Sequence, residues 1–377
     1  MNLSTLRHSK THWATKNKRR PPFEIPLLPF AAPVIVAMAL FTSGAPFAMA
    51  HGPAAGHGPG LQGRNLSGAN LSGQDYSGAS MQGADLSGAN LSRADLSMAN
   101  LQGADLTGAN LEGADLSRAR MEGATVSAAR MAGAILKYAS AQGVDFSDSD
   151  LRRVDFSRAM MQSVDLRGAD LSAARMSDVH LEGAKMAEVV MPGADLSGAN
   201  LQSARLSRAN LAGADLSGAR MEGADFSRAV LAGADLSFAN LQSADFRKAD
   251  LRGALIVGAR MEGADYSGAD MSGAVIMEAD RDKKADPRDF SGAHTDFTHL
   301  GRDGDEYFIQ ARLAAACHSK YAAAGILRQT AGEKPRAPEK NGVLNHIVHL
   351  DKDLEGHIRK KCGKETVDYL KDEGLLE

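Results

Sequence analysis

Residues 81–100 read MQGADLSGANLSRADLSMAN, and this stretch decides the fold. An apolar residue occurs at every fifth position, beginning with Met81. Ala usually stands two residues before it and Asp or Asn one residue before it, while Ser and then Gly or another small residue usually follow. Working outward in both directions, the same pattern extends from Leu61 to Ile276, and all 44 of its fifth positions are apolar.

A period of five residues predicts a coiled chain. It matches neither an α-helix, with 3.6 residues per turn, nor a long strand, with a period of two. Two inward positions separated by one outward residue make a very short extended segment, after which the chain must turn a corner. We therefore expect Ala and the Leu-type residue to fill a narrow interior. The Asp or Asn between them points outward, where its short side chain can hydrogen-bond backbone amides at the corner.

A second period, of 20 residues, sets the number of sides. The residue that follows every fourth Leu-type position is always Gln or Glu, and it is Gln or Glu at only one of the other equivalent positions, Glu112. Four sides of five residues give about 11 coils, and strands stacked about 4.8 Å apart give a rod about 53 Å long. The residues of this column are Gln62, Gln82, Gln102, Glu122, Gln142, Gln162, Glu182, Gln202, Glu222, Gln242 and Glu262.

The Gln/Glu column is interpreted as structural. Stacked Gln side chains can form an amide ladder, as in in-register β-stacks. The four Glu never occupy neighbouring coils, and each has Arg or His two residues earlier. Because these charges are locally neutralised and exposed ion pairs contribute little, a ladder is favoured over a binding stripe.

The tandem motif A(D/N)LSG resembles the pentapeptide repeat family over residues 61–276. The resemblance implies an all-β solenoid, a right-handed quadrilateral β-helix with the Leu-type residue and the Ala pointing inward. It does not imply one activity. Some relatives are similar to B-form DNA in shape and charge and bind type II topoisomerases, whereas many exported relatives have no known activity.

Composition and charge exclude several classes of protein. Only 5% of the residues are aromatic, too few for the bulky core of a conventional enzyme domain. The net charge is +5 over residues 1–50, −8 over 51–280 and zero over 281–377. This distribution gives no basic stripe for nucleic acid. No phosphate loop, catalytic triad or metalloprotease motif occurs, so we expect no enzyme activity and no cofactor.

The N-terminus predicts export. Residues 1–50 combine basic residues, an apolar stretch and the small-x-small pattern Ala48-Met49-Ala50, which is typical of a cleaved signal peptide. Several prolines interrupt the apolar stretch, so we expect no stable membrane span after cleavage, although retention as an uncleaved anchor stays open. Residues 51–60 form a Gly/Pro linker. The predicted location is the bacterial periplasm or cell envelope.

The repeat degenerates between Arg120 and Val190, where Val often replaces Ala and Ala141 replaces Leu. Sequence drift on a tolerant scaffold explains this stretch. The alternative is a docking patch for an acidic protein partner. Its candidate residues are Lys137, Tyr138, Arg152, Arg153, Arg158 and Arg167.

After the predicted β-helix of residues 61–280, an irregular connector over 281–302 leads to a small α-helical C-terminal region over 303–377. Its last expected helix covers Glu365 to Lys371. The two cysteines of the chain, Cys317 and Cys362, lie in this region, and an oxidising compartment favours a disulfide between them. A stripe of residues at helical spacing is either a solvated flank or a metal site, and it consists of His346, His349, Asp353 and His357.

The sequence thus predicts an exported structural or protein-interaction scaffold. Two alternatives stay open: a DNA mimic that binds a type II topoisomerase, and an envelope protein that binds metal through the C-terminal His stripe. The partner is an unidentified protein, and a homodimer is a further expectation.

Overall fold

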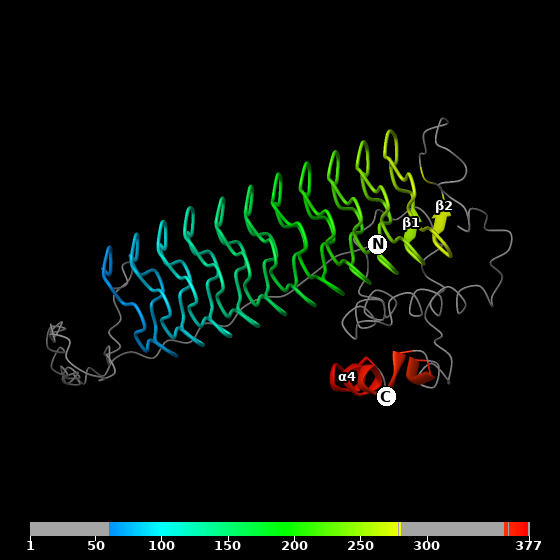
Figure 1. The fold of residues 1–377 in the computed structure, drawn as a ribbon. Coiled ribbons are helices and arrows are strands. Elements are labelled where there is room, and N and C mark those ends of the chain that lie inside the picture. The colour runs from blue at the N-terminus through cyan, green and yellow to red at the C-terminus, as the bar shows by residue number, and fades with distance from the viewer. Residues whose placement is uncertain (1–59, 278, 280–357, 361, 376–377) are drawn as a thin grey trace, which may run out of the picture. The chain divides into compact units, whose positions relative to one another are not determined.

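The structure is a computed structural model, and it describes residues 60–277, 279, 358–360 and 362–375. The predicted signal peptide, nearly all of the linker, the connector over 281–302 and most of the C-terminal region lie outside the described residues. Within the described repeat region, successive coils stack along one axis into a β-helix (Figure 1).

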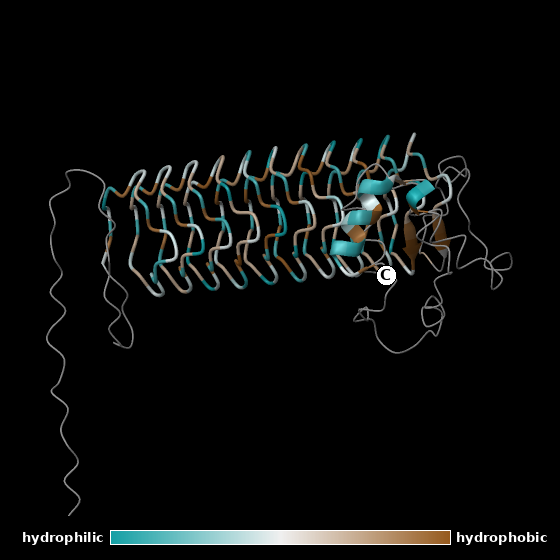
Figure 2. Cartoon of the chain, turned by 90° about the horizontal axis from the view of Figure 1, so that it is seen from below, coloured by the Kyte–Doolittle hydropathy of each residue, from teal (hydrophilic) through white to brown (hydrophobic). Residues whose placement is uncertain are grey.

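The coils pair at a constant offset of 20 residues, as the second sequence period predicts. Parallel bridges join Gly60 to Ser80 and continue in the same register to the bridge between Asp250 and Asp270. Most of these pairings are single bridges because each side holds one bridging residue before the chain turns. The longer strands β1 (Leu255–Val257) and β2 (Val275–Met277) pair in parallel with Ile256 opposite Ile276. Figure 2 colours both strands as hydrophobic.

Each coil therefore has four walls, which we number from the bridging residue that begins each of them. In the first coil, wall 1 covers residues 60–64, wall 2 covers 65–69, wall 3 covers 70–74 and wall 4 covers 75–79. Residues 20 positions apart stack on the same wall. A residue's remainder on division by 20 thus gives its wall and its place on that wall.

The interior holds the Ala and Leu-type residues, as predicted. From Tyr76 to Leu251, every Leu-type side chain is at most 1% exposed. At the first coil, Leu61 and Leu66 are only partly buried. Aromatic rings fill parts of the interior, including a parallel stack of Phe226, Phe246 and Tyr266 with ring centroids 5.1 and 5.0 Å apart. The core is one continuous column of small and branched side chains.

Backbone hydrogen bonds explain the repeat motif. In the side that begins at Leu66, the amide of Leu66 donates to the carbonyl of Asp85 in the next coil at 2.7 Å. The amide of Gly68 donates to Ser87 and that of Ala69 to Leu66. The remaining amide, of Ser67, donates to the side-chain Oδ1 of Asn65 at 3.0 Å. The predicted role of Asp and Asn at the corner is confirmed, because without it one amide per side would have no backbone partner.

The corner residue two positions after each Leu-type residue has a positive φ. Glycine occupies most of these places, with φ between 59 and 71° at the rod's corners. Non-glycine residues occupy the others with φ between 55 and 61°. A side chain there costs about 1–2 kcal/mol relative to an ordinary backbone conformation, so each such residue strains the backbone of the rod.

In the C-terminal region, the structure describes the helix α4 (Lys364–Asp372). It follows Gly363, whose φ of 83° suits only glycine well, and it buries Thr366, Val367 and Leu370. The hydroxyl of Thr366 donates to the carbonyl of Cys362 at 3.0 Å. Cys362 is disulfide-bonded, but Cys317 lies outside the described residues, so its pairing with Cys362 stays a prediction.

Candidate functional site

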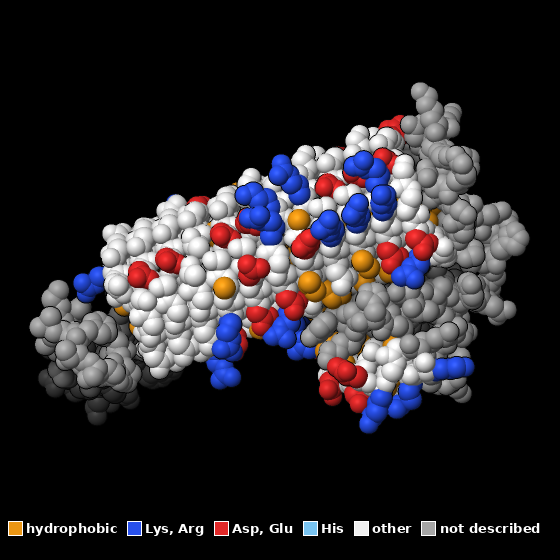
Figure 3. All heavy atoms as spheres, in the orientation of Figure 1, with side chains coloured by type: hydrophobic (Ala, Val, Ile, Leu, Met, Phe, Trp, Pro, Cys, Tyr) orange, Lys and Arg blue, Asp and Glu red, His pale blue; other side chains and the backbone are white. Residues whose placement is uncertain are grey.

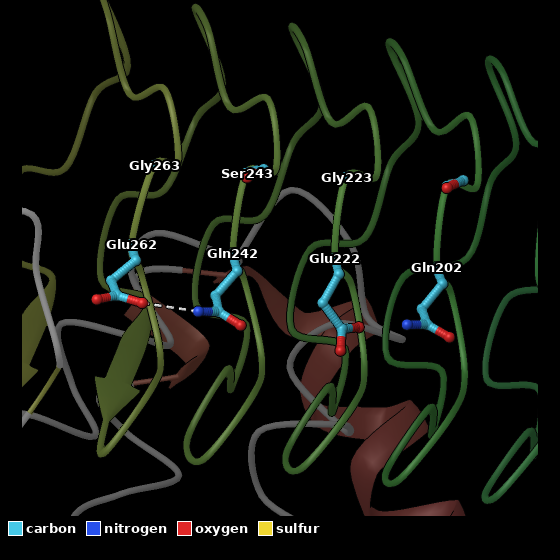
Figure 4. A pocket seen from close by; sticks show the side chains of 8 residues that line it. Gln202, Glu222, Gly223, Gln242, Ser243, Glu262 and Gly263 are labelled. Carbon is cyan, nitrogen blue, oxygen red and sulfur yellow. Dashed lines mark hydrogen bonds between the residues drawn. The ribbon is translucent and has the colours of Figure 1, made fainter.

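Wall 1 carries the Gln/Glu column and a shallow groove. The eleven predicted residues stand one above another, because the residues two positions before them pair continuously from Gly60 to Arg260. Figure 4 shows four of them, from Gln202 to Glu262, projecting side by side from successive coils. Together with the small residue that follows each, these four line a groove of about 670 Å³.

The column is only partly an amide ladder. Gln62 donates to Gln82 at 2.9 Å, and Gln242 donates to Glu262 at 2.8 Å. The other three Glu accept bonds from side chains 18 residues later: Glu122 from Ser140, Glu182 from Asn200 and Glu222 from Asn240. The sequence analysis placed the column correctly but missed these cross-coil donors.

Three of the four predicted charge pairs form on wall 1. Glu122 lies 4.0 Å from Arg120, Glu182 lies 3.3 Å from His180, and Glu222 lies 3.8 Å from Arg220. The fourth, between Arg260 and Glu262, does not form within the described residues, and Glu262 bonds to Gln242 instead. Burial alone would raise the pKa of Glu122, but the Ser140 hydroxyl, other donors and Arg120 hold that pKa below its usual value.

The groove is a polar stripe whose two carboxylates accept hydrogen bonds from side-chain amides, Glu222 from Asn240 and Glu262 from Gln242. Within the described residues, no group of three or more His, Cys, Asp or Glu side chains could hold a metal ion. The predicted metal stripe, His346, His349, Asp353 and His357, lies outside the described residues.

The six residues of the predicted docking patch lie on three walls. Lys137, Tyr138 and Arg158 are on wall 4, Arg152 and Arg153 on wall 3, and Arg167 on wall 2. The structure brings the first three together and separates the others from them.

Every cation of this set is paired with a carboxylate. Lys137 lies 3.1 Å from Asp155, and Arg158 lies 3.3 Å from Asp178. The three remaining pairs are Arg152–Asp150, Arg167–Asp165 and Arg153–Glu373. On the face drawn in Figure 3, basic and acidic side chains are likewise interspersed. Charge alone therefore does not mark these six residues as one binding surface.

A different feature stands out on wall 4. Two guanidinium groups lie against the ring of Tyr138, from Arg118 in the coil before and Arg158 in the coil after, each 5.9 Å from the ring centroid. Arg158 also donates to the Tyr138 hydroxyl at 3.1 Å. This bond and the neighbouring Asp178 raise the pKa of Arg158 above its usual value. The tyrosine is thus held in place while 49% of its surface stays exposed.

Exposed apolar side chains lie beside this tyrosine. Ile135 is 37% exposed on the same wall, and Met160 is 45% exposed just across the corner from Arg158. We call Arg118, Ile135, Tyr138, Arg158 and Met160 the Tyr138 edge. Sequence reasoning noticed two of its members as part of a basic stretch. The sequence also contains a signal for the other three, Arg118, Ile135 and Met160. When the outward residues are aligned at the 20-residue period, bulky side chains follow one another at this corner.

No helix among the described residues has the length and apolar character that crossing a membrane requires.

Comparison with known sequences decides the family. The pentapeptide repeats profile matches in eight copies, over residues 65–98, 99–137, 142–178, 174–213, 209–247 and 244–280. The chain belongs to the pentapeptide repeat family. Members of this family form right-handed β-helices, and the coil pairing described above fits that architecture. No curated protein matches the chain.

Solved pentapeptide repeat proteins are similar to this chain. HetL from the cyanobacterium Nostoc sp. strain PCC 7120, described as involved in the regulation of heterocyst differentiation, is 34% identical. That match covers 57% of this chain and 92% of HetL, with a TM-score of 0.33. A protein from the thylakoid lumen of Arabidopsis thaliana is 32% identical over 27% of this chain and 67% of its own, with a TM-score of 0.22. Full-length QnrB1, a plasmid-mediated fluoroquinolone resistance protein, is 21% identical. That match covers 58% of this chain and 93% of QnrB1, with a TM-score of 0.24.

Proposed function

We propose that this protein is an exported structural or protein-interaction scaffold that acts without catalysis. In this proposal a right-handed quadrilateral β-helix of about 11 coils, followed by a helical C-terminal region, holds a binding surface rigidly in the bacterial periplasm or cell envelope. The N-terminal 50 residues direct export, and cleavage after Ala50 leaves His51 as the mature N-terminus.

The Tyr138 edge is the observation that carries the binding role. Outward positions of the repeat are mostly Asp, Asn, Ser or Gly, yet this corner exposes an aromatic ring and two aliphatic side chains within two coils. Tyr, Met and Arg are enriched at the centres of protein interfaces. A ring already held by two guanidiniums loses little conformational entropy when a partner covers it.

The rod's ionisable residues support the absence of catalysis. Its Asp side chains accept bonds from corner amides, as Asp95 does from Ser97 at 2.9 Å. They are therefore committed to the backbone of the repeat rather than gathered around a cleft. Other carboxylates are paired with cations, as Asp245 is with Arg247 at 2.6 Å.

Fractionation and cross-linking in cells test this proposal. N-terminal sequencing of the mature protein should begin at His51, and the protein should occur in the periplasmic or envelope fraction. A photo-reactive amino acid at Ile135 should then capture a protein in that compartment, whereas the same group at Thr107 on wall 2 should not. An intact precursor confined to the cytoplasm would contradict export and would favour the topoisomerase-binding alternative.

A further inference from the structure

The corner that carries Tyr138 holds a run of strained backbone positions. In five successive coils the positive-φ place is occupied by a residue other than glycine, with φ between 56 and 60°. These residues are Met98, Arg118, Tyr138, Arg158 and Asp178. Each of these side chains costs about 1–2 kcal/mol of folding stability, a cost that glycine at the same place would avoid. The wall 2 corner also carries six non-glycine residues with positive φ, so the distinguishing feature of this column is the exposed Tyr138 ring between the guanidiniums of Arg118 and Arg158.

The charges on wall 4 define what the edge can bind. Arg118 and Arg175 are exposed and make no ion pair with any residue that the structure describes. Between them, Lys137 is paired with the buried Asp155, so the carboxylate there is not available to solvent. Arg118 and Arg175, neither of them in an ion pair among the described residues, therefore stand on either side of the exposed Tyr138 and Ile135.

Acidic columns close the two ends of this surface. Wall 4 stacks Asp75 and Asp95 before the coil of Arg118, and Asp195, Asp215 and Asp235 after the coil of Arg175. Within the surface, Asp115 shares the coil of Arg118, and Asp178 is paired with Arg158 at 3.3 Å. An acidic partner that extended over these columns would be repelled. The favourable footprint is thus confined to the three coil steps from Arg118 to Arg175, roughly 14 Å along the rod.

We propose that the Tyr138 edge, together with Arg175, binds an extended acidic segment of a partner protein, with two carboxylates four residues apart and an aliphatic residue midway. A strand rises about 3.3 Å per residue, so residues i and i+4 span about 13 Å and share one face with residue i+2. The carboxylates meet Arg118 and Arg175, and the aliphatic side chain packs on Tyr138 and Ile135. This inference rests on the proposed scaffold function and specifies the chemistry of its partner.

Peptide binding to the full chain tests the proposal. The probe is a fluorescein-labelled peptide, Gly-Ser-Asp-Ser-Leu-Ser-Asp-Ser-Gly, and binding is followed by fluorescence anisotropy at low salt. Saturable binding is expected. Replacing both Asp of the peptide by Asn, or its Leu by Ser, should weaken binding by roughly tenfold or more, as for the loss of an interface hot spot.

The variant Tyr138→Gly separates binding from folding. It removes the ring and relieves the positive-φ strain, so the melting temperature should stay the same or rise while binding falls by roughly tenfold or more. Arg208→Gly is the matched control, because Arg208 has a φ of 59° at the same kind of corner on wall 2. It should leave peptide binding unchanged.

Any one of four results would overturn the inference: no saturable binding, equal binding by Tyr138→Gly, equally tight binding of the Asn peptide, or equally tight binding of a single-stranded DNA oligomer. If peptide binding failed while photo-cross-linking from Ile135 in cells still captured a protein, the partner chemistry would be wrong and the scaffold function would stand.

Discussion

At the scale of single residues, an outward Asp or Asn satisfies a backbone amide that the coil itself leaves over, as Asn65 does for Ser67 at 3.0 Å. This role follows from the sequence alone, because an Asx turn needs only a short side chain two residues before a free amide. Val190 is an instructive exception. It offers no acceptor, and the residue two positions later is Pro192, which has no amide to satisfy.

Gly103 tests the cost of a side chain at a corner. Its φ is +63°, and an added Cβ would meet no atom within 4 Å. Gly103→Ala should therefore lower the free energy of unfolding by about 1 kcal/mol through backbone strain alone. The reverse change, Ala128→Gly at a φ of 55°, should not destabilise the rod. Equal melting temperatures for Gly103→Ala and the native chain would contradict this explanation.

Asp215 gives the stability a distinct pH dependence. Burial, reinforced by the adjacent Asp235, raises the pKa of Asp215 to about 6. The folded chain therefore binds more protons than the unfolded chain between the ordinary aspartate pKa and pH 6, and ionisation above pH 6 is destabilising. Asp215→Asn should be more stable than the native protein at pH 7, with the difference shrinking as the pH falls from 6 to 4.

The control for this experiment is Asp270→Asn. Bonds from Ser272 lower the pKa of Asp270, so its ionised form stabilises the fold at neutral pH and that contribution is lost on acidification. Urea unfolding across pH 4–7 should show differences from the native chain of opposite sign for the two variants. A pH-independent difference for Asp215→Asn would contradict the assigned cause.

At the scale of one coil, the sequence predicts which side chains point inward but not how they fill the space. The coil that contains Ala141 in a Leu place also contains Phe146 and Phe156, whose rings meet edge to face with centroids 5.6 Å apart. The expected pattern of one small and one large residue per side is thus relaxed within a coil. Pairings between charged side chains were equally hard to predict, because long side chains reach across coils, as Arg208 does to Glu188 at 3.1 Å.

Phe246 tests the aromatic stack inside the rod. It is fully buried between the rings of Phe226 and Tyr266. Phe246→Ala should lower the free energy of unfolding by about 3–5 kcal/mol because it leaves a cavity in a packed column. Phe238→Ala is the matched control, since Phe238 lies on the outside and is 44% exposed. Comparable losses for the two variants in thermal unfolding would contradict the assignment of inward and outward positions.

At the scale of the whole molecule, the β-helix and its family were predictable because every side repeats the same physical solution. The Tyr138 edge was only partly predictable. Tyr138 and Arg158 are not neighbours in the sequence, and they become neighbours only when the chain is wound at 20 residues per coil. The predicted docking patch grouped these two residues with Arg152, Arg153 and Arg167 because all of them are close in the sequence. The winding of the chain places the last three on other walls.

The most direct test of the account measures this winding with paired cysteines. Ser67 and Ser87 lie 20 residues apart with their hydroxyl oxygens 2.9 Å from each other, whereas Ser77 and Ser87 lie on opposite walls. Under mild oxidation, the double variant Ser67→Cys/Ser87→Cys should form an intramolecular disulfide that mass spectrometry of the digested protein detects. Ser77→Cys/Ser87→Cys should form none. A disulfide in the second variant, or its absence from the first, would contradict the square coil on which the binding surface depends.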